Sequence, residues 1–336
     1  MSSLKLFVSI LLLAVGSGLS SLPASAQTAH AHPAHDTPKT FSFAVLGDTP
    51  YSERESYWAR EVLKDIDRED LQFVLHVGDI KGGQEPCSDE LLKERRDLLS
   101  ATRHALVLLP GDNDWTDCHR RSAGGFDPME RLEKLRELLY ADDQTLGGSP
   151  FKVQRQSEIA KFRPYRENMR WEIGNVLFVS LNVPGSNNNY LTGAGRNGDF
   201  EERLIANEFW LQRAFAYAKK RQLAGVVVTF QANPFFEGIA NPFKRDGFLE
   251  LRQWLVQQAE NFKGQVLLIH GDTHTYRFNR PLQVGSGRGK TVPNLARLES
   301  FGSPSALSWI KVTVDPTKPE LFSIETRQLM QGASSN

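Results

Sequence analysis

The chain has little cysteine, little methionine and no excess of charge of either sign. Its 336 residues contain 2 Cys and 4 Met, and 40 basic side chains balance 40 acidic ones. A formal net charge of zero leaves no overall field that would attract nucleic acid or an anionic membrane, so any anion must be recognised locally. With 40% hydrophobic and 24% charged residues, the composition is that of a globular protein with a large core.

Long apolar runs are absent after the first residues of the chain. Lys5 precedes the ten-residue apolar run 6–15, and Ala24-Ser25-Ala26 has the small-x-small pattern of a cleavage site. The run is too short to span a bilayer, and the arrangement is typical of a secretory signal peptide; a retained anchor is the alternative. We therefore expect cleavage near Ala26 and a secreted or periplasmic chain without a membrane span.

The sequence divides into four segments. After the signal peptide at residues 1–26, residues 27–40 hold three histidines among Ala, Pro and Thr, which favours a disordered leader over a metal-capturing one. We expect a single domain over residues 41–329 and a short tail over residues 330–336.

Both cysteines follow short loops behind apolar runs, Cys87 in VGDIKGGQEPC and Cys118 in PGDNDWTDC. Their spacing matches no redox or metal motif, and an exported chain folds where disulfides persist. We therefore expect Cys87 and Cys118 to pair and to join two loops on the same rim of the fold.

Four apolar runs of strand length each end in Gly-Asp. They are FSFAVLGD, LQFVLHVGD, ALVLLPGD and QVLLIHGD, which end at Asp48, Asp79, Asp112 and Asp272. Helices are expected at residues 53–69, 88–103, 128–141, 200–221 and 247–262. Further strands are expected at residues 176–181, 225–230, 309–314 and 321–326, the last two antiparallel. Buried strands that alternate with helices predict an α/β fold in which helices cover sheet.

The four strands that end in Gly-Asp would bring like charges together. In such folds ligands gather beyond the carboxyl ends of the strands, and a glycine before each Asp lets neighbouring loops approach closely. Four carboxylates at one edge would repel one another strongly enough to require cations. A shared metal site is therefore preferred over four independent turns, although Asp is also common in turns.

The order of these motifs resembles that of the calcineurin-like metallophosphoesterases. Along the chain come Asp48, Gly78-Asp79, Gly111-Asp112-Asn113-Asp114 and Gly271-Asp272-Thr273-His274. The family pattern is Asp-x-His, Gly-Asp, Gly-Asn-His followed by an acid, a later His, and Gly-His-x-His. The resemblance covers residues 41–329 and rests on the ordered set, because no single motif is specific. It implies a four-layer α/β/β/α sandwich with mixed sheets and a two-metal centre at one edge.

Several positions depart from the family pattern, and nearly every imidazole has become an oxygen donor. Pro50 replaces the His of Asp-x-His, and Asp112 replaces the Asn ligand of the third motif. Asn113 replaces the His that assists phosphate chemistry in the family. Gln231 replaces the later His, and Asp272 replaces the first His of the last motif. His274 keeps the second His of that motif.

Carried over by position, the resemblance assigns two ions that share Asp79. One would be held by Asp48, Asp79 and His274, and the second by Asp79, Asp112, Gln231 and Asp272. An almost all-oxygen shell suits hard cations, so we expect two divalent ions, with Mn²⁺, Mg²⁺ or Ca²⁺ favoured over Zn²⁺.

The residues expected to act in catalysis are Asn113, Asp114 and His274. Asn113 can orient a phosphate but cannot transfer a proton at neutral pH. Proton delivery then falls to Asp114, to a metal-bound water or to His274, and Asp114 is otherwise expected to hold Asn113 or the water.

Substrate contacts are expected from Asn113, Asn182 and Arg277. Asn182 opens an Asn- and Gly-rich loop, residues 182–199, that could serve as a substrate lid or be an ordinary surface loop. Arg277 and the basic residues Lys81, Arg120 and Arg121 lie near the motifs and could clamp an anion, or could simply be solvated surface charge.

The sequence thus predicts an exported, metal-dependent phosphoesterase acting on a small phosphate-containing substrate. The alternative is a weakly active or inactive relative that binds a divalent cation or a phosphoryl ligand. A purely structural domain would leave the Gly-Asp ends unexplained. The sequence carries no nucleic-acid signature and indicates neither the substrate nor the oligomeric state.

Overall fold

The computed structural model describes residues 39–190, 197–235, 245–282 and 291–329. The predicted signal peptide at residues 1–26 and tail at 330–336 lie outside these ranges, as do most of the predicted leader and part of the 182–199 loop. The described residues belong to one compact unit. None of the helices in the described ranges is long and apolar enough to cross a membrane.

The described strands form two mixed sheets. The order in the first is β13 (Phe322–Gln328), β12 (Ser308–Val314), β1 (Phe41–Leu46), β2 (Phe73–His76), β3 (Ala105–Leu108), β4 (Leu146–Gly147). The order in the second is β10 (Arg277–Asn279), β11 (Leu295–Glu299), β9 (Gln265–His270), β8 (Gly225–Thr229), β7 (Val176–Ser180), β6 (Met169–Ile173), β5 (Gln154–Arg155). Strands β1, β2 and β3 are parallel, and so are β7, β8, β9 and β11. As expected, β12 and β13 are antiparallel.

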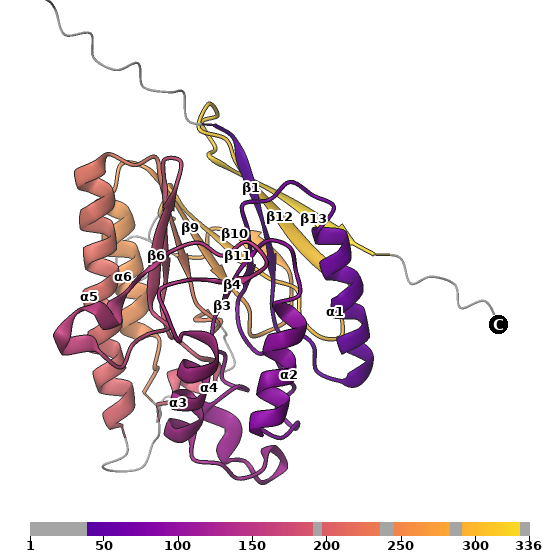
Figure 1. The fold of residues 1–336 in the computed structure, drawn as a ribbon. Coiled ribbons are helices and arrows are strands. Elements are labelled where there is room, and N and C mark those ends of the chain that lie inside the picture. The colour runs from indigo at the N-terminus through magenta and orange to yellow at the C-terminus, as the bar shows by residue number, and fades with distance from the viewer. Residues whose placement is uncertain (1–38, 191–196, 236–244, 283–290, 330–336) are drawn as a thin grey trace, which may run out of the picture. The chain divides into compact units, whose positions relative to one another are not determined.

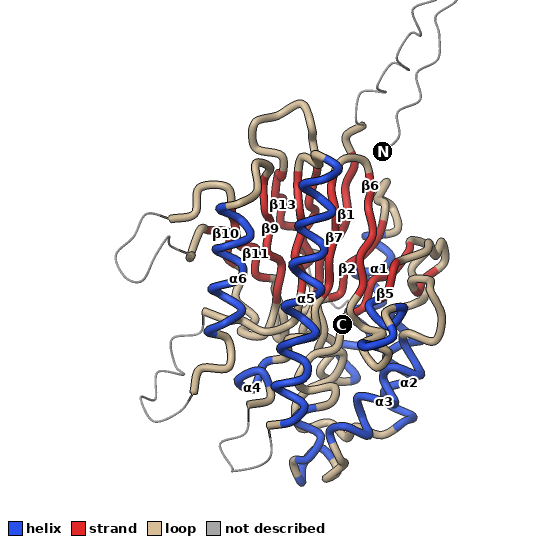
Figure 2. Tube along the Cα trace, turned by 90° about the vertical axis from the view of Figure 1, so that its left-hand side faces the viewer, coloured by secondary structure: helices blue, strands red, loops and turns tan. Residues whose placement is uncertain are grey.

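Helices cover the outer faces of the two sheets (Figures 1 and 2). They are α1 (Glu53–Ile66), α2 (Asp89–Leu99), α3 (Pro128–Leu139), α5 (Gly198–Arg221) and α6 (Leu249–Glu260). The four-residue α4 (Gly185–Asn188) is instead a left-handed turn in the loop after β7. Figure 1 shows α5 and α6 on one side and α1 on the other. The apolar faces of α5 and α6 pack on β7, β8 and β9 in one core cluster. The predicted α/β/β/α sandwich is confirmed.

Aromatic side chains fill the space between the sheets. Phe43 of β1 stacks on Phe73 of β2 with ring centroids 4.8 Å apart. Phe178 of β7 meets both rings edge-on, at 5.4 and 5.2 Å, and stacks on Trp171 of β6. Edge-to-face contacts of this kind stabilise the fold beyond what the burial of apolar surface contributes. This core fixes the two sheets face to face, so that their carboxyl-end loops meet.

The predicted helices are confirmed, with ends that shift by a few residues. Ser52, Ser88 and Asp127 accept hydrogen bonds from backbone N–H groups in the first turns of α1, α2 and α3. These side chains satisfy donors that have no partner within the helix. Each cap therefore sets where its helix begins.

Five strands were not expected from the sequence: β4, β5, β6, β10 and β11. Strand β11 reads LARLE, yet all five of its residues are buried. Its charges are paired, since Glu299 lies 2.6 Å from Arg277 and 3.6 Å from Arg297. The charged residues give this strand the sequence pattern of an exposed segment, because the Arg277 side chain that pairs with Glu299 comes from another strand.

The predicted disulfide between Cys87 and Cys118 is confirmed, with Cα atoms 5.7 Å apart. Both sulfur atoms are buried, and they lie 3.6 and 3.7 Å from the carbonyl oxygen of Asn113. The bond therefore joins the loops that follow β2 and β3 directly beneath Asn113.

We expect Cys87→Ser to lower the free energy of unfolding by about 3–4 kcal/mol, because the closed loop restricts the unfolded chain. Urea unfolding of the oxidised parent and the variant measures this difference. Reduction of the parent should reproduce it. Equal stability of oxidised and reduced parent would contradict the prediction.

Candidate metal centre

The Gly-Asp motifs converge beyond the carboxyl ends of parallel strands from both sheets. Asp48, Asp79 and Asp112 follow β1, β2 and β3, whereas Gln231 and Asp272 follow β8 and β9. Asp48, Asp79 and Asp272 have positive φ angles of 51°, 54° and 82°. Non-glycine residues adopt this region rarely, and such backbone is concentrated at functional sites.

Asp79 lies at the centre of the cluster. Its Oδ1 accepts the backbone N–H of Asn113 at 2.9 Å. Its Oδ2 accepts the hydroxyl of Tyr51 and the amide Nε2 of Gln231, both at 3.1 Å. The carboxylate thus receives donors from both sheets.

Asp48 and His274 form one side of the cluster. The backbone N–H of Asp272 donates to both oxygens of the fully buried Asp48, at 3.0 and 3.1 Å. His274 Nδ1 lies 2.6 Å from the carbonyl oxygen of Ser303, which can only accept, so Nδ1 carries the proton. The lone pair of Nε2 therefore faces the cluster, 3.8 Å from Asp48 Oδ1 and 3.4 Å from the Tyr51 hydroxyl.

Asp112 and Asp272 form the other side, around Gly185. A methyl group built on Gly185 would lie 2.7 Å from Asp112 Oδ1 and 2.7 Å from Asp272 Oδ1, so glycine leaves room where the two oxygens converge. Asp112 Oδ1 is buried and has no hydrogen-bond partner among the described residues. Asp112 Oδ2 accepts the Ser186 hydroxyl at 2.8 Å.

Burial and mutual repulsion disfavour the ionised forms of Asp48, Asp79 and Asp272. Burial, followed by the charges of neighbouring aspartates, raises the pKa of Asp48 and of Asp79 well above the usual range. The same causes, burial first and then Asp112, raise the pKa of Asp272 to about 7. The cluster therefore favours protons or cations as partners.

The donor chemistry fits hard divalent ions, with one exception. The unpaired Asp112 Oδ1, the converging Asp272 Oδ1 and the Nε2 of His274, which faces the cluster, are ligand atoms of the right kind. Gln231 differs: its Oε1 accepts the N–H of Gly185 at 2.6 Å, so its NH₂ faces the carboxylates. Because an amide nitrogen does not ligate, Gln231 would bind an ion only with its amide turned over.

The side chains do not form a closed ion cage as they stand. No three His, Cys, Asp or Glu groups within the described ranges converge closely enough to hold an ion. Most of the carboxylate oxygens already accept hydrogen bonds, as Asp272 Oδ2 does from Asn233 N–H at 2.8 Å. Holding an ion would require the aspartates to rotate away from these donors.

Asp114 has different partners from those that the sequence suggested. Its carboxylate accepts the backbone N–H groups of Gly111, Asp79 and Ile80 at 2.8, 3.0 and 2.9 Å. It therefore fastens the β2 and β3 loops together, and both of its oxygens accept backbone N–H groups. Asn113 instead donates from Nδ2 to the Tyr51 hydroxyl at 3.1 Å.

The two predicted substrate contacts outside the cluster are engaged elsewhere. Asn182 is fully buried and donates from Nδ2 to Glu167 at 3.0 Å. Arg277 is half-exposed, but its guanidinium pairs with the buried Glu299 and contacts the Thr273 hydroxyl at 3.2 Å. The structure brings neither side chain into contact with the aspartate cluster.

Four residues of the site were not assigned from the sequence: Tyr51, Asp117, Gly185 and Ser186. Tyr51 follows Asp48 by only three residues and reads as an ordinary rim tyrosine. Gly185 and Ser186 lie in the Asn-rich loop after β7, which reads as a surface loop. Proximity to a motif was the one signal available for Tyr51 and Asp117.

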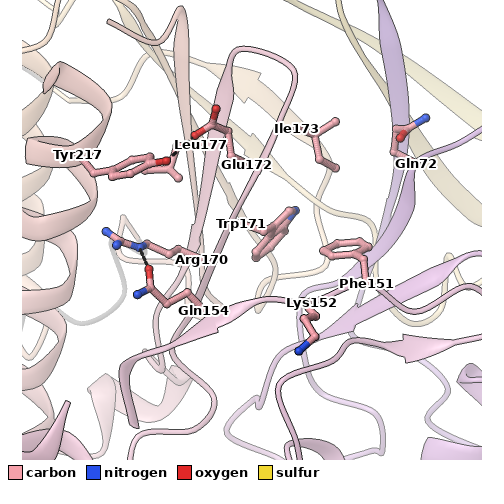
Figure 3. Close-up of a pocket in the computed structure, with 10 residues that line it drawn as sticks. All are labelled: Gln72, Phe151, Lys152, Gln154, Arg170, Trp171, Glu172, Ile173, Leu177 and Tyr217. Carbon is pink, nitrogen blue, oxygen red and sulfur yellow. Dashed lines mark hydrogen bonds between the residues drawn. The ribbon is translucent and has the colours of Figure 1, made fainter. Parts of the chain in front are cut away.

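A separate cavity of about 470 Å³ lies along the outer edge of β6 (Figure 3). Arg170 donates to Gln154 at 2.7 Å, and the Tyr217 hydroxyl donates to Glu172 at 2.9 Å. Because these polar groups satisfy one another and no residue of the aspartate cluster lines the cavity, it is not part of the candidate centre.

Comparison with known proteins was carried out at three levels. No protein-family model matches the chain, and no curated protein matches it. Solved structures do match. A dimetal phosphatase from Danio rerio is 12% identical, with 86% of this chain and 96% of that chain covered and a TM-score of 0.53.

Two further structures have TM-scores of 0.51 and 0.50. The purple acid phosphatase PPD1 of yellow lupin (Lupinus luteus) is 11% identical over 87% of this chain, which spans 52% of the lupin chain. GAP50, described as the anchor in the inner membrane complex of Plasmodium, is 13% identical over 87% of this chain and 90% of that chain. At such low identity the likeness establishes the fold. The chain has the metallophosphoesterase fold, as its resemblance to the calcineurin-like metallophosphoesterases predicted.

Proposed function

We propose that the chain is an exported, metal-dependent phosphoesterase that hydrolyses a small phosphate ester. The observation that carries the proposal is the convergence of Asp112 Oδ1, which is buried and unpaired, with Asp272 Oδ1 over Gly185. Both oxygens belong to a cluster at the carboxyl ends of both sheets, where ligands of α/β folds gather. The similarity of the fold to two phosphatases supports the same reaction class.

Asp48, Asp79 and His274 would hold one divalent ion, and Asp79, Asp112 and Asp272 the second, with Gln231 joining if its amide turns. Such ions, when bound, polarise a phosphoryl oxygen and activate a water molecule for attack. Two structural features prepare the chain for this role. The Ser303 carbonyl fixes the ring of His274, and the Asp114 carboxylate fixes the loops that carry Asp79 and Asp112.

The chain's own polar groups would orient the phosphate. Asn113 Nδ2 and the Tyr51 hydroxyl lie side by side, 3.1 Å apart, beside Asp79 and His274. Asn113 can donate a hydrogen bond to a phosphoryl oxygen but supplies no proton to a leaving group. The site is therefore suited to esters whose leaving groups need little protonation.

A second candidate is a non-catalytic relative that binds a divalent cation or a phosphoryl ligand. It is favoured by the loss of imidazoles and by the hydrogen bonds that occupy the carboxylates. The similar fold of GAP50, described as an anchor, is consistent with a scaffold used for binding. Hydrolysis of 4-nitrophenyl phosphate by chelator-stripped protein, with and without added Mn²⁺, separates the two candidates.

The first prediction from the proposed function concerns metal identity and Asp79. Mn²⁺ or Mg²⁺ should restore more activity to stripped protein than Zn²⁺, because the shell is almost all oxygen. Loss of a residue that hydrogen-bonds to a metal ligand lowers metal affinity or activity about 10–100-fold. Asp79→Asn should lower the rate by more than that, and by more than the replacement of any other single ligand, because Asp79 alone would contact both ions. Steady-state rates measure both effects, with Asp70→Asn on the surface as control; a zinc preference would contradict the ligand assignment.

The second prediction concerns the stability of the cluster. Asp272→Asn should raise the melting temperature of the metal-free chain, because it removes one of several mutually repelling charges in a largely buried cluster. The same change should reduce the rise in melting temperature that Mn²⁺ produces. For the parent, an ion present at about 100 times its Kd should add about 2.7 kcal/mol. Thermal unfolding with and without Mn²⁺ tests this, and an unchanged response to Mn²⁺ in the variant would rule out Asp272 as a ligand.

The third prediction concerns Asn113. Asn113→His would place an imidazole beside Tyr51, and general acid assistance contributes on the order of 10²–10⁴ in rate when the group reaches the leaving oxygen. Hydrolysis of alkyl phosphates should rise, whereas aryl phosphates, whose leaving groups need no proton, should change little. Parallel kinetics on both classes decide it: equal effects, or none, would leave Asn113 as a loop residue.

A further inference from the structure

The side chain of Gln231 connects the two sheets at the centre of the aspartate cluster. It is fully buried and follows β8 of the second sheet, whereas Asp79 follows β2 of the first. Its Nε2 donates to Asp79 Oδ2 at 3.1 Å, and its Oε1 accepts the backbone N–H of Gly185 at 2.6 Å. One amide thus joins a carboxylate of one sheet to the loop that follows β7 in the other.

The orientation of this amide is set by its neighbours. A backbone N–H can only donate a hydrogen bond, so the atom that faces Gly185 must be the amide oxygen. The NH₂ group therefore faces the carboxylates. If the amide turned over, two donors would face each other at Gly185 and two acceptors at Asp79, so both hydrogen bonds would be lost.

The NH₂ group of Gln231 serves more than one carboxylate. Burial raises the pKa of Asp48 and of Asp272, and a hydrogen bond from the Gln231 side chain opposes that rise in both. Together with Asp79, the amide thus reaches three acids that come from both sheets. Carboxylate oxygens that converge on one point are those that would face a cation placed there. The NH₂ group lies where such a cation would lie.

The rest of Gln231 is held as firmly as its amide. Its carbonyl oxygen accepts the N–H of Gly271 at 2.9 Å, and the N–H of Ala232 donates to Val183 at 3.0 Å. A methyl group built on Gly78 would lie 3.0 Å from Cγ and 3.1 Å from Cβ of Gln231, so the loop after β2 packs directly on this side chain. In so dense an interior the side chain has little room to withdraw when an ion enters.

We infer that Gln231 competes with a divalent ion for the carboxylates and is not one of the ion's ligands. Its NH₂ group holds the acids together in the metal-free chain, and its displacement weakens the binding of metal. The inference rests on the proposed function in taking a divalent ion as the partner. It goes beyond that function by assigning the residue that lets the chain stay folded without metal and limits its affinity for metal.

The test is calorimetric titration of the chelator-stripped chain and of two Gln231 variants with Mn²⁺. Gln231→Met is similar in size and removes the donor without supplying a hard ligand, because a thioether is a soft one. Its Mn²⁺ affinity should rise by about 10-fold, the lower end of the effect of residues that hydrogen-bond to metal ligands. Gln231→Glu keeps an oxygen towards Gly185 and replaces the NH₂ group with a second oxygen, so its affinity should rise further.

Thermal unfolding gives a second measurement, with Gln156→Met as the matched control. Without metal, both Gln231 variants should melt below the parent, because the acids lose a donor, and both should gain more from added Mn²⁺. Gln156 is also fully buried, and its Nε2 donates to the carbonyl oxygen of Ala206 at 2.8 Å. Gln156→Met should lower the melting temperature and leave the Mn²⁺ affinity unchanged.

Two results in solution would overturn the inference. They are a Mn²⁺ affinity that falls in Gln231→Met, as the loss of a ligand requires, and an affinity that does not rise in Gln231→Glu. If the variants do not fold, crystals of the parent soaked in Mn²⁺ decide. An ion in contact with the Gln231 side chain overturns the inference, whereas an ion held by the acids away from that side chain supports it.

Failure of the proposed function gives a different pattern. A parent that takes up no Mn²⁺ is not a metal-dependent phosphoesterase. The inference is then supported if Gln231→Met binds Mn²⁺, because removal of the amide alone has opened the cluster to the ion. It is overturned if neither protein binds the ion.

Discussion

Repulsion among buried carboxylates at one edge of the two sheets is the constraint on which the rest of the structure depends. Asp48, Asp79, Asp112 and Asp272 are placed there by the ends of four strands. Burial and the neighbouring charges disfavour the ionised forms of Asp48, Asp79 and Asp272. The fold tolerates them because backbone N–H groups and the amide of Gln231 donate to them. A chain selected only for stability would replace such acids, and this is the physical basis of the proposal that a cation binds here.

The surrounding features keep the cluster in place. The disulfide and the Asp114 carboxylate tie the β2 and β3 loops together. The edge-to-face aromatic contacts between the two sheets hold their strand ends at the same edge of the fold. Arg203 donates to the carbonyl oxygen of Asn188 and so holds the left-handed turn at residues 186–189, which brings Gly185 and Ser186 over the acids. Removing any one of these supports would let the carboxylates separate, which repulsion favours. The positive φ angles in these loops are thus an energetic cost of holding like charges close together.

The sequence predicted the elements whose signal is local. Apolar runs that end in Gly-Asp identified β1, β2, β3 and β9, and amphipathic periodicity identified the long helices. Strands such as β11 were missed because buried Arg297 and Glu299 read as surface charge until their partners are known. The same limit applies to the site: Ser186 and Asp117 meet only because Arg203, far along the chain, fixes the intervening turn. Asp114 was recognised as important, but its backbone partners depend on the meeting of two loops.

The central claim is that the aspartate cluster is a divalent cation site. Anomalous scattering from crystals of the chain soaked in Mn²⁺ tests it most directly. The account expects Mn²⁺ next to Asp112 and Asp272 over Gly185, and a second ion between Asp48, Asp79 and His274. Crystals that show no Mn²⁺ at this edge, with the carboxylates still bonded to their present backbone and amide donors, would contradict the account.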